Sequence, residues 1–267
     1  MTIRKCFACM VFAVIFCLAA VLHIQALDFS LGGGQLIGYT FTRYTLEDTG
    51  TMPGQISSPR GNLVSKQSMD RFDYGVFLFF DASYVEFSIL FEQGINTYHE
   101  TLDFKLAEFP AISMGDGAGA GSELNLGFSL RGKYPFPLTK RLSVFPLAGV
   151  EYQIALLEER KPNGENDTKD RTSGELPEDV DKDGHSYPLS AWNALWINIG
   201  AGMDYTLSGG LYLRWEVLFG FRLPTGYENG ALENVKKRFN ASDPKLKGLT
   251  GSPVVVIGFG YRFAPGQ

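Results

Sequence analysis

Cysteine is almost absent from this chain of 267 residues, and the few cysteines present are unevenly placed. All three, Cys6, Cys9 and Cys17, lie close to the N-terminus. If the chain is cut after Ala26, the remainder has no thiol, so it forms no disulfide, binds no zinc through cysteine and has no cysteine nucleophile. A chain without thiols also crosses an oxidising compartment without mispairing.

Long apolar runs are missing too, except for one near the N-terminus. Arg4 and Lys5 precede an unbroken apolar run over residues 6–22, and the small residue Ala26 follows it. These features predict a cleaved signal peptide over residues 1–26, although the length of the run leaves an uncleaved anchor open. No later segment has the length of a membrane-spanning helix, which excludes a helical membrane protein.

Basic stripes and catalytic motifs are lacking as well. The net charge of −5 becomes −7 without Arg4 and Lys5, and no basic stripe suggests nucleic-acid binding. After residue 26 only His99 and His185 remain, both in predicted loops and neither near a Gly-x-Ser-x-Gly context. The sequence therefore predicts no catalytic residues and no cofactor, although a triad assembled in space would escape this argument.

Strict alternation of side chains is the strongest positive signal. From Val255 to Phe263, large apolar residues occupy every odd position, while Gly258 and Gly260 lie between them. A strand turns successive side chains to opposite faces, so this segment has one wide apolar face and one small or polar face. A lipid-facing strand of a membrane β-barrel has this pattern, and an aromatic content of 13% suits the aromatic girdles of such barrels.

The same alternation recurs along the chain and predicts eight strands. Their approximate bounds are Leu27–Tyr44, Arg71–Ala82, Val85–Thr97, Glu123–Tyr134, Leu142–Leu156, Ala191–Tyr205, Leu211–Leu223 and Val255–Phe263. Short turns alternate with four long loops, at Thr45–Asp70, Tyr98–Ser122, Leu157–Ser190 and Pro224–Gly251. We therefore expect an all-β fold, a closed antiparallel eight-stranded transmembrane β-barrel over residues 27–263, with short periplasmic turns and long extracellular loops. Residues 264–267 form a short tail.

Three segments resemble a known family. They are Phe145–Tyr152 (FPLAGVEY), Ile199–Tyr205 (IGAGMDY) and Ile257–Phe263 (IGFGYRF). They are similar to strands of the small eight-stranded bacterial outer-membrane barrels, the OmpA, OmpX, OmpW-like and opacity-like group, with OmpW-like proteins the nearest within it. The resemblance implies an outer-membrane location, contact with outer-membrane lipid, a monomer, and passage of small hydrophobic molecules.

The same resemblance assigns a role to the end of the chain. Phe259, Tyr261 and Phe263 correspond to the terminal aromatic signal that the barrel-assembly machinery recognises. Many members of the group end on the aromatic residue itself, whereas four residues follow Phe263 here.

The inward parity of the predicted strands carries charges of both signs. The charged residues are Arg71, Arg131, Lys133, Arg214, Arg222, Arg262, Asp28, Asp73, Asp81, Glu86, Glu92, Glu151, Asp204 and Glu216. An eight-stranded barrel has room only for side chains or one small ligand, so these charges should pair and plug the lumen. The same parity also turns apolar residues inward, namely Phe77, Phe79, Phe145, Leu147, Trp192, Trp196 and Leu218. These residues could instead line a path for small hydrophobic molecules, or simply pack as core.

Three predicted loops have distinctive sequences. The loop over residues 158–190 is acidic, and it contains Asp179, Asp181 and Asp183 at the spacing that starts a calcium-binding loop. The twelfth position of such a loop is Ser190 here rather than glutamate. A solvated loop and weak surface Ca²⁺ binding therefore both stay open. Val235–Phe239 is basic and is either an exposed loop or a patch for anionic glycolipid or glycan. Gly115–Gly121 (GDGAGAG) is predicted to be a flexible loop tip, without the context of a phosphate-binding loop.

Three functional classes follow from these observations. The first is a non-enzymatic outer-membrane barrel, either passing small hydrophobic molecules or plugged and acting through its surface as a structural protein, adhesin or antigen. The second is a lipid-modifying barrel enzyme, which would need a histidine-assisted nucleophile at the rim. The third is a secreted soluble carrier, which would need the opposite arrangement of apolar and polar faces.

Overall fold

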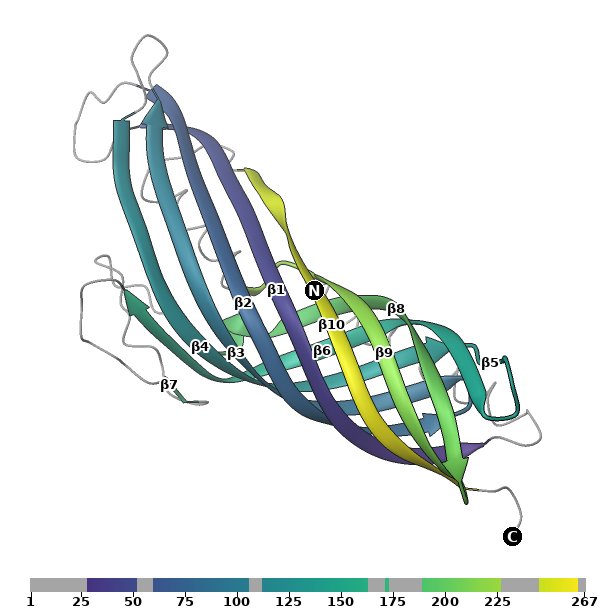
Figure 1. The fold of residues 1–267 in the computed structure, drawn as a ribbon. Coiled ribbons are helices and arrows are strands. Elements are labelled where there is room, and N and C mark those ends of the chain that lie inside the picture. Colours follow the sequence, from purple (N-terminus) through teal and green to yellow (C-terminus); the bar gives the residue numbers. More distant parts are fainter. Residues whose placement is uncertain are drawn as a thin grey trace, which may run out of the picture.

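A long antiparallel sheet makes up almost all of the computed structural model (Figure 1). The structure describes residues 28–51, 60–105, 112–162, 171–172, 189–226 and 245–263. Within them the long strands are β1 (Phe29–Thr51), β2 (Arg60–Ala82), β3 (Val85–Lys105), β4 (Ile112–Lys133), β6 (Leu142–Pro162), β8 (Ala194–Ser208), β9 (Leu211–Arg222) and β10 (Lys245–Phe263). The short elements are the strands β5 (Phe136–Pro137) and β7 (Arg171–Thr172) and the 3₁₀ turn η1 (Leu189–Trp192).

The eight long strands close into a ring. β1 pairs with β2 on one side and with β10 on the other, and both pairings are antiparallel. The pairings β2–β3, β3–β4, β4–β6, β6–β8, β8–β9 and β9–β10 complete the circle. The predicted fold class, an antiparallel eight-stranded barrel, is therefore confirmed. Among the described residues no helix has the length and apolar character needed to cross a membrane.

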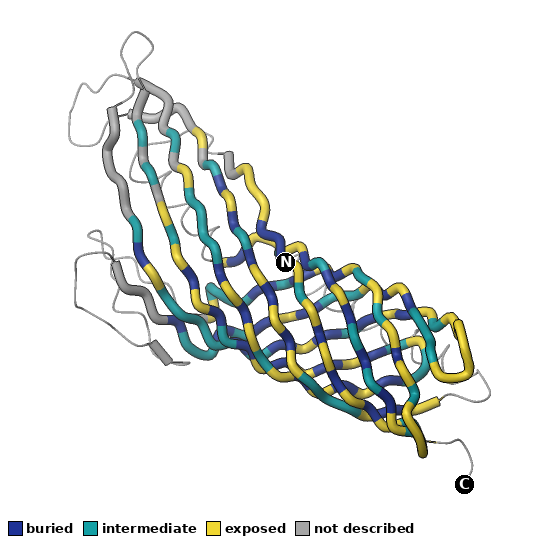
Figure 2. The backbone as a smooth tube through the Cα atoms, in the orientation of Figure 1, coloured by how far each residue is buried: buried dark blue, intermediate teal, exposed yellow. Residues whose placement is uncertain are grey.

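Burial alternates along every strand of the ring (Figure 2). On β2, for example, Phe77 and Phe79 are buried, whereas Val76 and Leu78 between them are exposed. The exposed positions around the ring carry mostly aromatic and aliphatic side chains. Twelve charged residues of the described ranges are buried inside the ring, so the polarity of this barrel is opposite to that of a soluble protein.

The strands are longer than the sequence predicts. The β1–β2 ladder continues through the predicted loop Thr45–Asp70 as far as the pair Thr51 and Arg60. The β3–β4 ladder continues through most of the predicted loop Tyr98–Ser122. As a result β1 and β2 have 23 residues each, against about twelve expected from the thickness of a bilayer.

The other two predicted loops are also shorter than expected, because strands extend into them. β6 extends to Pro162 inside Leu157–Ser190, and β10 begins at Lys245 inside Pro224–Gly251. The physical reason is that alternation in the sequence detects where one face meets an apolar medium. Antiparallel pairing needs only backbone N–H and C=O groups, so a ladder can continue where both faces are polar.

The glycine-rich segment is strand rather than a flexible tip. Gly119 and Gly121 belong to β4 and pair with Tyr98 and Asn96 on β3. Glycine was expected to loosen the chain here, but the β3 backbone supplies hydrogen-bonding partners, so the missing side chains do not prevent pairing. This prediction was wrong.

The turns at one end of the ring are tight. β8 and β9 are joined through Gly209 and Gly210, whose φ angles of 58° and 88° lie in the left-handed region. Two successive residues with positive φ are what a type I′ hairpin requires, and glycine adopts them without steric cost. The turn between β2 and β3 likewise places Ser83 at a φ of 53°.

The ring is uneven in height. β8 and β9 have 15 and 12 residues, and the β8–β9 ladder ends at Trp196 and Arg222. Figure 1 shows β1, β2, β3 and β4 continuing together beyond that level as a tall curved wall. The interior of the complete ring lies between this wall and the tight turns, and it holds the candidate site.

Candidate functional site

Glycines on neighbouring strands make room for the large side chains inside the ring. Four inward rings pack against a glycine in this way: Phe79 on Gly32, Tyr212 on Gly260, Phe145 on Gly202 and Trp196 on Gly220. A narrow barrel cannot fit bulky groups from adjacent strands at the same level, so small and large residues complement each other. The interior is therefore a packed core in its middle section.

A buried group of charges fills the lumen near the tight turns. We define the Arg214 cluster as Arg214, Arg131, Lys133, Asp81, Glu86, Asp204 and Glu216. Arg214 on β9 has 0% of its surface exposed and lies at the centre. Its Nε and Nη2 donate to both oxygens of Asp204, at 2.8 and 2.9 Å, and Nη2 also donates to Asp81 Oδ2 at 2.7 Å. Nη1 donates to Glu86 on β3.

Aromatic rings enclose the same guanidinium group. Its central carbon lies 4.4 Å from the centroid of Phe79 and 5.3 Å from those of Phe145 and Tyr212. Such contacts add favourable cation–π interaction at a buried site. Arg214 thus connects strands on opposite sides of the lumen and closes the space between them.

Two more cations complete this cluster from β4. Arg131 Nη1 donates to Glu216 Oε2 at 3.0 Å and to Glu86 Oε1 at 3.4 Å. Lys133 donates to Asp81. Removing one partner from a buried network of this kind leaves an uncompensated charge, which typically costs about 3–5 kcal/mol.

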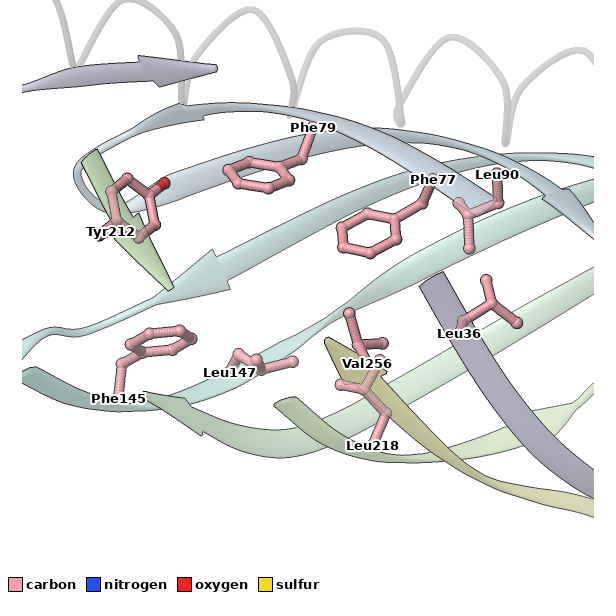
Figure 3. Packing of buried hydrophobic residues seen from close by; sticks show 9 residues of the cluster. All are labelled: Leu36, Phe77, Phe79, Leu90, Phe145, Leu147, Tyr212, Leu218 and Val256. Atoms are coloured by element: carbon pink, nitrogen blue, oxygen red, sulfur yellow. The ribbon is translucent and has the colours of Figure 1, made fainter. Parts of the chain in front are cut away.

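An apolar layer packs against the Arg214 cluster and includes the three rings that contact Arg214. It consists of Leu36, Phe77, Phe79, Leu90, Phe145, Leu147, Tyr212, Leu218 and Val256, all 5% exposed or less (Figure 3). Figure 3 shows these side chains converging on the lumen from opposite walls. Of the residues predicted to line an apolar path, this packed layer contains Phe77, Phe79, Phe145, Leu147 and Leu218. Phe77 and Phe79 stack with centroids 5.7 Å apart.

A second buried group of charges lies beyond the apolar layer. We define the Arg71 cluster as Arg71, Asp73, Glu92 and Glu123. Arg71 Nε lies 2.5 Å from Asp73 Oδ1, and Nη1 lies 2.5 Å from Glu123 Oε2. Arg71 Nη2 lies 3.5 Å from Glu92 Oε1. Thr40 donates a hydrogen bond to Asp73 Oδ2 at 2.6 Å.

A small chamber lies next to the Arg71 cluster. The chamber has a volume of about 30 Å³. This is enough for about two water molecules. Part of its lining is apolar, including Leu36, Phe77, Leu218, Val256 and Trp196. The rest is polar, including Thr40, Arg71, Glu92, Arg131, Glu151, Gln153, Asn198 and Ser252.

Most of the residues predicted to line the lumen are buried in the ring. They are Phe77, Phe79, Phe145, Trp196, Arg131, Arg214, Glu216, Glu86, Glu92 and Glu151. Arg222 is half-buried at the end of β9, and Trp192 is half-buried on η1 rather than on a strand. The Arg262 side chain is 39% exposed, and Asp28 is exposed just before β1, because at the ring's edge inward parity no longer means burial.

The sequence argument did not assign Leu36, Leu90, Val256 or Glu123 to the lumen. All four share the inward parity of their strands, which is the signal that could have found them. Leu36 follows three glycines that interrupt the pattern, and Glu123 was predicted to lie at the very start of its strand. Position on a strand, and not residue type alone, was the missing information.

Other predicted sites lie on the outer face or beyond the described residues. Phe259, Tyr261 and Phe263 are exposed on the outer face of β10. His99 is exposed on β3. Asp179, Asp181 and Asp183, the signal peptide over residues 1–26 and the tail over residues 264–267 lie outside the described residues. In the described part of the chain, no group of three or more His, Cys, Asp or Glu side chains is arranged to hold a metal ion.

Comparison with known proteins finds similarity at the level of structure. No family model matches the sequence, and no curated protein matches it. The outer membrane protein OprG from Pseudomonas aeruginosa is 13% identical with a TM-score of 0.38, covering 89% of this chain and 96% of that one. Neisserial surface protein A is 9% identical with a TM-score of 0.33, covering 87% and 99%.

The outer membrane protease OmpT from Escherichia coli is also similar, at 6% identity with a TM-score of 0.35, covering 90% of this chain and 99% of that one. Identities of 6–13% and TM-scores of 0.33–0.38 assign no function to this chain.

Proposed function

We propose that the protein is an integral outer-membrane β-barrel that is closed to passage along its axis and has a structural or surface-interaction role, without catalytic residues. One observation carries the closed lumen: the fully buried Arg214 side chain contacts Asp81 on β2, Glu86 on β3 and Asp204 on β8. Charges held by partners on several strands form a cross-link through the whole width of the lumen.

Membrane insertion is supported by the outer face. Exposed large apolar side chains occur on each of the eight long strands of the ring, among them Leu31, Leu78, Ile89, Phe128, Tyr152, Ile199, Val217 and Phe259. Soluble monomers rarely expose apolar patches of more than a few hundred Å². A closed ring also leaves no unpaired strand edge within the bilayer, which is the other requirement for spanning it.

The last strand supports a further part of the proposal. Phe259, Tyr261 and Phe263 project outward from β10, and Tyr261 and Phe263 contact each other with centroids 5.3 Å apart. An exposed aromatic ridge at the end of the last strand is accessible to an assembly factor before the ring closes. We propose that the barrel-assembly machinery recognises it and that the assembled barrel is a monomer.

Passage of small hydrophobic molecules is the second candidate. The apolar part of the chamber lining favours it, because Phe77, Leu218 and Trp196 could contact an apolar solute. A complete path would still require Phe79 and Phe145 to move aside and the Arg214 cluster to separate. Weak Ca²⁺ binding by Asp179, Asp181 and Asp183 stays a separate prediction.

Flux through liposomes tests the closed barrel against the passage of solutes. The full chain is reconstituted, and the entry of small apolar and small charged solutes is compared with protein-free vesicles. We expect no flux above background for either class in wild-type protein. Flux of apolar solutes that falls in Trp196→Ala would instead favour the hydrophobic path, and flux of charged solutes would contradict the plug.

A further inference from the structure

A groove lies on the outer face of the ring over β6, β8 and β9, with a volume of about 460 Å³. Ala201 on β8 is an exposed residue at its centre and pairs with Pro146 on one side and Val217 on the other. The small side chain of Ala201 lies among larger neighbours, which leaves the hollow. The outward side chains that line the groove are all apolar, namely Val144, Pro146, Ala201, Met203, Trp215 and Val217.

The connection between β4 and β6 lies just beyond this groove. Figure 1 shows this connection, with β5, at the end of the ring where the β8–β9 turn lies. Thr139 N donates to the carbonyl oxygen of Leu142 at 3.1 Å, and Thr139 Oγ1 accepts from Arg141 N at 3.2 Å. The carbonyl oxygen of Arg141 accepts from Thr206 N on β8 at 2.7 Å. These bonds hold Lys140 and Arg141 in a defined turn at the start of β6.

Lys140 and Arg141 are exposed to an anion at this turn. Within the part of the chain that the structure describes, neither side chain forms an ion pair with a carboxylate. Arg141 comes three positions before Val144, the first groove residue of β6. Three residues of extended strand span about 10 Å. The two cations therefore lie at one end of the groove.

Aromatic residues mark the level of the lipid headgroups at the same end. Tyr134 and Phe136 are exposed in the connection between β4 and β6, with ring centroids 4.9 Å apart. Tyr205 is exposed on β8, next to the residue that bonds to Arg141. Membrane barrels place such aromatic residues in a girdle at the interface between lipid and water. Lys140 and Arg141 thus lie at the level of the phosphate groups, and the groove lies at the level of the acyl chains.

We propose that one anionic glycerophospholipid binds here, with an acyl chain in the groove and its phosphate group at Lys140 and Arg141. Charge complementarity selects an anionic headgroup, because basic residues at a membrane surface attract anionic lipids. A second copy of the chain is a poorer occupant, since a two-fold dimer through this face would bring the same cations of both copies together. The site rests on the membrane insertion proposed above, and not on the closed lumen.

The test uses the full chain with Trp192→Phe in vesicles of phosphatidylcholine. Trp215 then is the tryptophan of the outer face and lines the groove, whereas Trp196 is buried in the lumen. Phosphatidylglycerol or phosphatidylcholine with brominated acyl chains is titrated in, because bromine quenches tryptophan fluorescence at short range. We expect brominated phosphatidylglycerol to reach half-maximal quenching at a mole fraction at least about threefold lower, and salt to reduce this preference.

A double variant assigns the preference to the turn. Lys140→Gln combined with Arg141→Gln should abolish it. Lys66→Gln combined with Lys247→Gln is the matched control, because it removes the same charge from two exposed lysines that flank Thr45 at the other end of the barrel. This control should keep the preference for phosphatidylglycerol.

A second pair of variants tests the groove. Ala201→Leu fills the hollow and should reduce the preference, whereas Ala148→Leu, at an exposed position of β6 outside the groove, should keep it. Both changes add the same apolar group to the outer face. If Trp192→Phe does not refold, the two lipids are compared on the wild-type protein.

The outcomes separate this site from the membrane assignment. Equal quenching by the two lipids would overturn the proposal, and so would a preference that survives in the double variant of the turn or in Ala201→Leu. Quenching by both lipids that weakens as the protein-to-lipid ratio rises would place a second copy in the groove and would also overturn it. Quenching by neither lipid would contradict membrane insertion itself.

Discussion

The ring of Phe145 on β6 lies against Gly202, its direct partner on β8. A β-carbon at Gly202 would lie 2.5 Å from Phe145 Cε2 and 3.0 Å from Glu216 Cγ. Phe145 also contacts the Arg214 guanidinium group, so this glycine supports the apolar layer and the Arg214 cluster together. The missing side chain is therefore a packing requirement of the interior.

Gly202→Ala should destabilise the barrel. The added methyl group must displace Phe145 or Glu216, and overpacking of this kind costs about 1–3 kcal/mol. The free energy of unfolding by urea in lipid vesicles measures the effect. Gly132→Ala is the matched control, because its β-carbon would lie 3.8 Å from the nearest atom and the residue is exposed. Equal stability of the two variants would contradict the packing argument.

Arg214→Met should lower the free energy of unfolding more strongly. It leaves Asp204 and Glu86 buried without their principal cation, for a loss of about 3–5 kcal/mol. Lys247→Gln removes one member of an exposed pair, whose side chains are 64% and 47% exposed, and should change stability by less than about 1 kcal/mol. Urea unfolding of both variants in the same vesicles provides the comparison.

A triple variant separates the loss of charge from the loss of packing. Arg214→Met combined with Glu86→Gln and Asp204→Asn removes the uncompensated carboxylates but keeps the volume. It should recover part of the stability lost in Arg214→Met. No recovery at all would mean that packing around the guanidinium group, and not charge, sets the loss.

The alternation along each strand allowed the sequence to predict which side chains point into the lumen. It predicts that Arg214 and Glu216 point inward, and both are buried. It does not predict which charges meet. Arg214 pairs with Glu86, 128 residues away in the chain, because strand tilt and register bring those levels together. Neither quantity is encoded in the alternation of a single strand.

The sequence did not predict where the strands end, and the reason is different. Beyond Arg43 the β1 residues no longer alternate between apolar and polar, yet the strand continues to Thr51. Pairing there depends on the neighbouring backbone, which the sequence of one strand does not contain. Glu123 was not predicted as a lumen residue for the same reason. Its place in the Arg71 cluster requires that β4 begin well before it.

The β8–β9 turn should respond differently at its two glycines. Gly209 has a φ of 58° and no atom within 4 Å of an added β-carbon, and asparagine adopts this conformation readily. Gly209→Asn should therefore change the free energy of unfolding by less than about 0.5 kcal/mol. At Gly210 the φ is 88° and the β-carbon would lie 2.6 Å from the carbonyl oxygen of Arg262, so Gly210→Ala should cost at least about 1–2 kcal/mol.

Refolding yield gives an independent measurement of the same turn. The Gly210→Ala variant should also fold less efficiently into vesicles, since this hairpin joins two adjacent strands of the ring. Equal tolerance at both positions would show that the turn is not held in the type I′ geometry.

A charge in the apolar belt distinguishes a membrane barrel from a soluble one. Val76 is 53% exposed and lies midway along β2 between the exposed residues Phe72 and Phe80. Arginine at the middle of a bilayer costs about 2–4 kcal/mol, falling to about 0–1 kcal/mol near the interface. Val76→Arg should therefore destabilise the protein in vesicles far more than Ser68→Arg, which lies beyond Asp70 on the same face. In a soluble carrier an exposed arginine at position 76 would be harmless, so equal stability of the two variants would remove the membrane assignment.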